Sequence, residues 1–187
     1  MSPALTLSPL LAPASSIDWK VSERFALAAN AKEMHCYTNA LRSMSPAMQY
    51  VEGLYVGSEF LLPFEHGWLE CDGTVVDPTL PLVDPGREQE WRHFGAFRWS
   101  LEQISELLNE RGGSVSTPLQ RYLPFWGKDE ETWLWATIRA HRHIAAVREQ
   151  RYGKHPTDPA DERELLRAII GDRWFAKATA GAIAPSR

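Results

Sequence analysis

The chain has 187 residues, of which 24% are charged, and its formal net charge at pH 7 is −4. This length suits one domain with a sizeable core, and a weakly acidic chain gives no electrostatic reason to expect nucleic acid as a partner. No apolar run approaches the roughly 20 residues that a membrane helix needs, so no membrane is expected either. The composition does not indicate an oligomeric state.

The cysteine count bears on the compartment. Only Cys36 and Cys71 are present, whereas small secreted domains usually carry more cysteines as disulfides. A reducing, cytoplasmic location is therefore expected. Residues 1–16 contain three prolines and no basic region of the kind that opens a signal peptide, so they are predicted to form an extended arm.

Helical periodicity begins after this arm. A first helix is expected over 22–31, and a second begins near Cys36 and ends before Pro46. In the second helix, apolar residues recur at the spacing of one buried face: Tyr37, Ala40, Leu41 and Met44.

Strand-forming residues follow. Residues 49–56 are predicted to form a strand, 65–79 a hairpin around Asp72-Gly73, and 91–98 a further strand. Ser100 is expected to cap the next helix, because the apolar positions Leu101, Ile104, Leu107 and Leu108 follow it.

The last third of the chain is predicted to hold a Pro-interrupted loop over 117–127 and two helices, over 129–151 and 159–178. Helix, then strands, then helices is the order of an α+β fold. We therefore expect three parts: the arm (1–16), a core (17–127) and a C-terminal helical hairpin (128–187) on or beside the core.

The hairpin brings two titratable side chains together. If Asp72 and Gly73 form the turn, Cys71 pairs with Thr74. His66 and Asp77 then share one face as diagonal neighbours, since side chains alternate along each strand. An imidazole in this position can donate one ring N–H to the carboxylate, which fixes its tautomer and favours its cationic form.

The same register separates the two cysteines. Cys71 falls on the opposite face and is predicted to be a small buried hydrophobe. Cys36 opens a helix, where backbone N–H groups and the helix dipole stabilise a thiolate. A thiolate beside a histidine is an activated nucleophile, and N–H groups of the first turn, such as that of Tyr37, can form part of an oxyanion site.

Three sequence blocks carry a family resemblance: Cys36-Tyr-Thr-Asn-Ala-Leu, His66-Gly-Trp-Leu-Glu and Asp72-Gly-Thr-Val-Val-Asp77-Pro-Thr. Their order resembles the papain-like and transglutaminase-like cysteine superfamily. The second and third blocks resemble small transglutaminase-like peptidases, including those that cut lasso-peptide leaders, and small bacterial and phage proteins. The resemblance covers residues 30–100. Gly67 stands where Ala is usual, and only 30 residues separate Cys36 from His66, which points to the compact members.

This resemblance implies a helix carrying the cysteine, packed on a small antiparallel sheet. It also implies a cysteine (thiol) peptidase with a catalytic triad of Cys36, His66 and Asp77, no cofactor, and a peptide or protein substrate. The family's oxyanion-stabilising side chain would be Asn30, six residues before Cys36, or Asn39 within the helix. A helix C-cap is the competing interpretation of Asn30.

Other interpretations remain open. His35, Cys36, His66 and Cys71 carry metal-ligand atoms, but no CxxC, HExxH or paired spacing accompanies them, so no metal is expected. Trp68 and Glu70 are candidates for a substrate groove, with core packing and an exposed strand position as alternatives. The sequence thus predicts a thiol-dependent hydrolase or acyltransferase. A catalytically inactive scaffold that acts as a protein-binding or inhibitor module is the alternative.

Overall fold

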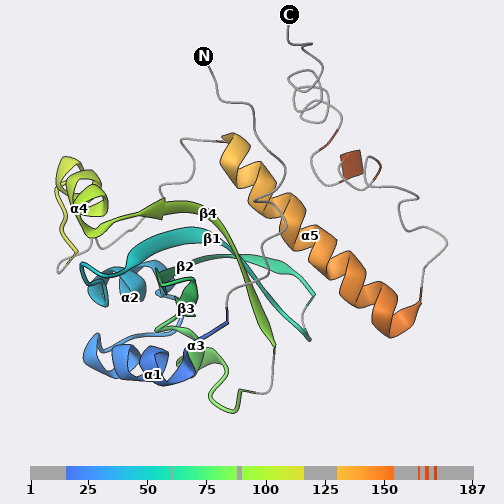
Figure 1. The fold of residues 1–187 in the computed structure, drawn as a ribbon, viewed down its shortest axis with the longest axis horizontal. Helices are drawn as coiled ribbons and strands as arrows, with labels where there is room; N and C mark the ends of the chain where they lie inside the picture. The colour runs from blue at the N-terminus through green and yellow to red at the C-terminus, as the bar shows by residue number, and fades with distance from the viewer. Residues whose placement is uncertain are drawn as a thin grey trace, which may run out of the picture.

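The computed structural model describes residues 16–59, 61–87, 90–115 and 130–153, and four single positions between 164 and 171. Within them, a four-stranded antiparallel sheet in the order β3-β2-β1-β4 is combined with five helices (Figure 1). The expected α+β class is therefore confirmed. Most of the predicted arm, the loop over 117–127 and most of the helix over 159–178 lie outside the described residues.

The described elements follow one another along the chain as α1 (Trp19–Ala28), α2 (Cys36–Arg42), β1 (Gln49–Gly57), β2 (Pro63–Cys71), β3 (Thr74–Val76), α3 (Leu80–Val83), β4 (Trp91–Trp99), α4 (Leu101–Glu110) and α5 (Glu130–Tyr152). The strands predicted over 49–56 and 91–98 and the starts of α2, α4 and α5 agree with the structure to within a residue. The hairpin predicted over 65–79 begins two residues earlier, and its strand pairing ends at Val76. None of these helices combines the length and apolar character that a membrane span requires.

The β2–β3 hairpin has the predicted register. Cys71 pairs with Thr74, and the pairing continues to Leu69 and Val76. Asp72 and Gly73 have φ values of 48° and 75°, and such positive angles at both central residues match the twist of the flanking strands. The ladder ends at Val76, so the residues beyond it reach the site without strand pairing.

Two helices differ from the prediction. Helix α1 begins at Trp19 because Asp18 caps it, with Asp18 Oδ1 accepting from the Val21 N–H at 2.9 Å. Helix α3 was not predicted, since its four residues include a proline and show no periodicity.

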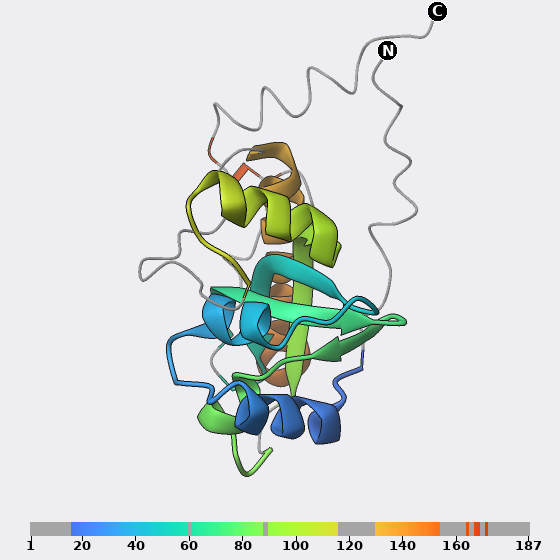
Figure 2. The ribbon, with the colours of Figure 1, turned by 90° about the vertical axis from the view of Figure 1, so that its left-hand side faces the viewer.

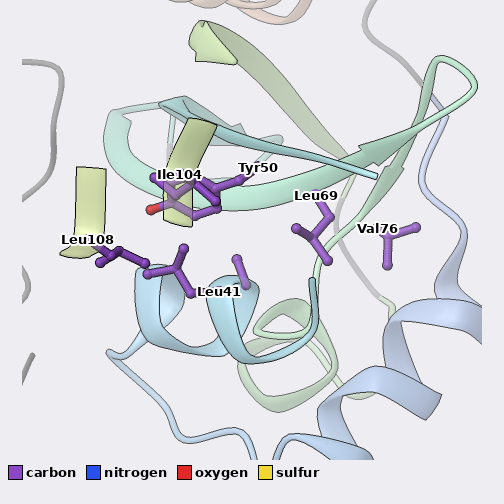
Figure 3. Packing of buried hydrophobic residues seen from close by; sticks show 7 residues of the cluster. Leu41, Tyr50, Leu69, Val76, Ile104 and Leu108 are labelled. Atoms are coloured by element: carbon purple, nitrogen blue, oxygen red, sulfur yellow. The ribbon is translucent and has the colours of Figure 1, made fainter. Parts of the chain in front are cut away.

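One hydrophobic core joins α2 and α4 to the sheet. Its seven buried residues come from α2, the first three strands and α4: Ala40, Leu41, Tyr50, Leu69, Val76, Ile104 and Leu108 (Figure 3). Ser100 starts α4 with a complete capping box, in which Ser100 and Gln103 each bond the backbone of the other. This core anchors α2 on the sheet and so positions its first residue.

Helix α5 packs on a second cluster. Ala140 and Ile144 lie against Leu54, Val56 and Leu61, with Phe94 at the edge. In Figure 1 α2 lies on the left of the sheet and α5 on the right, and Figure 2 accordingly shows α2 in front and α5 behind. The helix that carries Cys36 and the long C-terminal helix thus pack on different parts of the sheet.

Candidate active site

His66 and Asp77 form a short hydrogen bond. His66 Nε2 lies 2.6 Å from Asp77 Oδ2, and the two side chains are 1% and 0% exposed. The strand register predicted that these groups would be neighbours, although Asp77 lies just beyond the end of β3. The bond assigns Nε2 of His66 to the carboxylate and leaves Nδ1 for a different partner.

The carboxylate of Asp77 is held from its other side by backbone. Its Oδ1 accepts from the N–H of Thr79 at 2.9 Å and from that of Leu80 at 3.4 Å, where α3 begins. The N–H of Asp77 donates to Ser22 Oγ at 2.9 Å, which ties the segment to α1. Asp77 is therefore fixed in position by α1 and α3 while its Oδ2 faces the histidine.

The charges of this pair support each other. Burial disfavours a charged imidazole, but attraction to Asp77 and Cys36, with hydrogen bonds to both, raises the pKa of His66 from 6.5 to about 10. Burial likewise acts to raise the pKa of Asp77, yet the charge and hydrogen bond of His66 bring it well below its usual value. An imidazolium–carboxylate pair is thus the stable form near neutral pH.

Cys36 is the third neighbour. It is the first residue of α2, it is half-buried, and its side chain contributes both a charge effect and a hydrogen bond to His66. Because His66 Nε2 faces Asp77, Nδ1 is the ring nitrogen left for a second partner. Cys36 is close enough to His66 to affect its titration, and Asp77 is hydrogen-bonded to the same ring.

A glycine allows this approach. A Cβ atom at Gly67 would lie 2.6 Å from Tyr37 Cδ1 and 3.1 Å from Tyr37 Cα. The residue after Cys36 therefore packs directly against the residue after His66. The glycine at position 67 is explained by this contact.

Two residues of the site were missed in the sequence. Tyr55 of β1 stacks on His66 with ring centroids 4.1 Å apart. His93 of β4 places its Nε2 3.1 Å from Asp77 Oδ2 and is also buried. Alternation along β4 gives the face of His93, but the sequence contains no signal that β1 and β4 lie beside β2.

Burial sets the protonation of these two residues. Burial, followed by the nearby Asp77 and Cys36 side chains, raises the pKa of Tyr55 to about 12, so it remains a neutral phenol. Burial also lowers the pKa of His93, although Asp77 opposes the shift. A neutral His93 donates its Nε2–H to Asp77, and Asp77 Oδ2 then accepts from both histidines.

His66, Asp77 and His93 also have the residue types of a metal site, with ligand atoms within 4.8 Å of one another. Two ligand atoms of one tetrahedral zinc lie about 3.3 Å apart for bonds of roughly 2.0 Å. The 2.6 Å between His66 and Asp77 is a hydrogen-bond distance instead. The geometry of His66, Asp77 and His93 therefore fits two histidines hydrogen-bonded to one carboxylate better than it fits a metal centre. This cluster shares only His66 with the four metal-ligand residues noted in the sequence, which were His35, Cys36, His66 and Cys71.

The oxyanion candidates have different environments. Asn39 is 2% exposed, and its amide bonds the Lys32 backbone through Oδ1 at 3.1 Å and Nδ2 at 2.8 Å, and Thr79 Oγ1 at 3.0 Å. Asn30 is exposed, with φ 48°, just after α1, as its capping interpretation predicts. The backbone N–H of Tyr37, one residue after the thiol, remains the candidate with a suitable location.

The groove candidates are engaged within the protein. Trp68 is fully buried, and its Nε1 donates to Glu70 Oε1 at 3.3 Å. Glu70 also binds Arg98 in a fork, with Nε–Oε2 at 2.8 Å and Nη2–Oε1 at 3.0 Å. Trp68 thus belongs to the core, and its ring stacks on that of His66 with centroids 6.2 Å apart.

Cys71 lies apart from this site. It ends β2 and is half-exposed, in place of the buried position expected for it, because the hairpin turn follows immediately. Both cysteines are free thiols.

In comparisons with known proteins, no family model, no curated protein and no solved structure matches this chain.

Proposed function

We propose that this protein is a thiol-dependent hydrolase or acyltransferase, with a papain-like or transglutaminase-like arrangement of Cys36, His66 and Asp77. The observation that supports it is the line of contacts from the Cys36 side chain through His66 to the buried carboxylate of Asp77. A histidine oriented by a carboxylate and adjacent to a thiol at a helix start is the arrangement that nucleophilic catalysis by cysteine requires.

In the proposed reaction His66 starts as the imidazolium. The sulfur of Cys36 attacks the carbonyl carbon, forming a C–S bond as the carbonyl π electrons move to oxygen. His66 Nδ1 then gives its proton to the leaving nitrogen or oxygen as that bond breaks, which leaves a thioester. Water or an amine attacks the thioester, His66 takes the proton from this nucleophile, and the C–S bond breaks to restore Cys36.

Asp77 holds His66 throughout this cycle. Its charge compensates the imidazolium, and its hydrogen bond keeps Nδ1 directed at the sulfur. Tyr55, stacked on His66, restricts rotation of the ring. A peptide or protein is the substrate class that the sequence resemblance favours, and a cytoplasmic location remains part of the proposal.

A direct test is the alkylation rate of Cys36 by iodoacetamide at about pH 6, where an ordinary thiol is almost fully protonated. The measurement uses a Cys71→Ser background so that only Cys36 reacts. We expect His66→Gln to slow the reaction at least about tenfold. Cys71 in a Cys36→Ser background is the matched control, and its rate should not respond to His66→Gln.

The proposal would be contradicted if Cys36 and Cys71 were alkylated at equal rates and His66→Gln had no effect on the alkylation of Cys36. That outcome would favour the second candidate, a catalytically inactive scaffold with a binding or inhibitory role. Two observations favour this inactive scaffold. Trp68 is buried and Glu70 is paired with Arg98, so neither residue lines an open substrate groove.

A further inference from the structure

Two arginines meet at Gly95, where α5 crosses β4. Arg139 of α5 donates from Nη2 to the Gly95 carbonyl oxygen. Arg98 Nη2 lies 2.8 Å from the position that a Cβ atom on Gly95 would occupy. The absence of a side chain at position 95 is therefore what lets both guanidinium groups approach the same backbone.

The positive charge here exceeds the negative charge. Glu70 already accepts the fork of Arg98 and the indole N–H of Trp68. Burial and then repulsion from Arg98 lower the pKa of Arg139, and Glu70 only partly offsets them. In the described part of the chain, two guanidinium groups thus share one carboxylate.

Two N–H donors at this place have no acceptor among the described residues. Arg139 Nε and Trp135 Nε1 are both buried and both lack a hydrogen-bond partner there. The two residues are one turn apart on α5 and so lie on the same face of the helix. Buried donors without an acceptor cost stability unless a bound group supplies one.

We propose that Arg139, Trp135 and Arg98 form a subsite for a carboxylate group, such as a peptide C-terminus or an acidic side chain. A planar carboxylate offers two oxygens to N–H donors and neutralises the surplus charge, which is the recognition that guanidinium groups favour. Arg98 is 42% exposed and Arg139 and Trp135 are half-buried, so the subsite borders solvent at Arg98, whereas the two donor atoms Arg139 Nε and Trp135 Nε1 are themselves buried.

Trp68 connects this subsite to the candidate triad. Its ring is 6.2 Å from that of His66, and its Nε1 donates to Glu70, the partner of Arg98. Binding of a carboxylate here would therefore favour acyl substrates that also carry a negative charge. That role in substrate selection rests on the proposed function, whereas the binding itself does not.

The test follows the indole N–H signals of ¹⁵N-labelled protein by NMR in a Cys36→Ser variant, in which no acylation can occur. Trp135→Phe identifies the Trp135 signal. We expect N-acetylglycine to shift this signal saturably and N-acetylglycinamide, which lacks the charge, to leave it unchanged. Titration with N-acetylglutamic acid α-amide then distinguishes a side-chain carboxylate from a terminal one by the tighter binding.

Arg139→Gln should weaken the binding at least about tenfold by removing the charge. Arg148→Gln removes a charge from an exposed position of the same helix and should have no effect. If Arg139→Gln is unstable, Trp135→Phe serves as the second variant. Binding is then followed by the backbone amide signal of Gly95, and we expect N-acetylglycine to bind Trp135→Phe more weakly than it binds the chain with Trp135.

The proposal is overturned if neither carboxylate shifts the signal, if the uncharged amide shifts it equally, or if inorganic phosphate binds more tightly than both carboxylates. Because Cys36 is absent from this experiment, its result is independent of the alkylation rates. If carboxylates bind but Cys36 is not activated in the alkylation experiment, the carboxylate subsite stands and the proposed enzymatic function is rejected.

Discussion

The ring of Tyr37 fills the space into which a side chain at position 67 would project, with 2.6 Å between Tyr37 Cδ1 and a Cβ atom placed on Gly67. Since Tyr37 follows Cys36 and Gly67 follows His66, this contact sets how closely the thiol approaches the imidazole. The position of a single glycine therefore couples the packing of α2 to the geometry of the candidate triad.

Gly67→Ala should reduce the free energy of unfolding by about 1–3 kcal/mol, because the added methyl group overpacks a buried contact. Urea denaturation measures this loss, and the alkylation rate of Cys36 should fall with it. Tyr37→Ala in the same chain removes the obstructing ring, so the double variant should lose less than the sum of the two single variants. Additive losses would show that the two positions are not in contact.

Asp77→Asn should lower the pKa of His66 from about 10. The attraction and hydrogen bond of Asp77 are removed, while the opposing effect of burial remains and Cys36 alone still raises the pKa. Titration of histidine ring signals by NMR measures this shift. A pKa of His66 that is unaltered by the substitution would contradict the assigned role of Asp77.

His93 is predicted to be a positioning residue for Asp77. His93→Gln keeps an N–H donor at a similar reach, whereas His93→Leu removes it from a buried carboxylate. We therefore expect His93→Leu to cost about 1–3 kcal/mol of unfolding free energy and His93→Gln distinctly less. The pH profile of Cys36 alkylation should shift in His93→Leu alone, a change that loss of packing would not produce.

Asn39→Ala separates a structural role from a catalytic one. The substitution removes three hydrogen bonds that connect α2 to Lys32 and Thr79, so thermal unfolding should show a loss of about 2–4 kcal/mol. Under conditions where the variant is folded, Cys36 alkylation should still depend on His66. Full stability combined with a lost reaction toward acyl substrates would instead identify Asn39 as the oxyanion donor.

The stability of the protein should depend on pH in a defined window. The raised pKa of His66 stabilises the folded state fully below about pH 6.5, and this contribution is lost as the pH rises to about 10. The lowered pKa of Asp77 adds stability above its ordinary value of 3.8 that is lost on acidification. The lowered pKa of His93 acts in the opposite direction near pH 6.5.

The free-energy difference between wild type and His66→Gln reports on the His66–Asp77 pair together with the effect of His66 on His93, whose pKa it helps to lower. This difference should be largest between about pH 4 and 6.5 and should shrink by a few kcal/mol toward pH 10. Urea denaturation across this range provides the comparison. A difference that is constant with pH would show that His66 is not cationic in the folded protein.

The sequence predicts the His66–Asp77 pair because local rules determine it. An Asp-Gly turn fixes the register of the hairpin, and strand alternation then gives the shared face. The docking of Cys36 depends on the packing of α2 on β2 through Gly67, a long-range contact without a local signal. Family resemblance, and not periodicity, provided that part of the prediction.

His93 and Tyr55 show the same limit. Each lies in a strand that was predicted, but the order β3-β2-β1-β4 and the register shift between β1 and β4 decide which residues reach Asp77. Trp68 shows the converse: its face was predicted, whereas its complete burial depends on Val51 and Val75, which pack around it.

The most direct test of the central claim is trapping of an acyl-enzyme with p-nitrophenyl acetate, followed by peptide mapping by mass spectrometry. Our account predicts one acetyl group on Cys36, accompanied by a burst of nitrophenolate stoichiometric with the protein, and loss of both in His66→Gln. Acetylation at Cys71 or at lysines alone, or labelling of Cys36 at equal rates with and without His66, would contradict it.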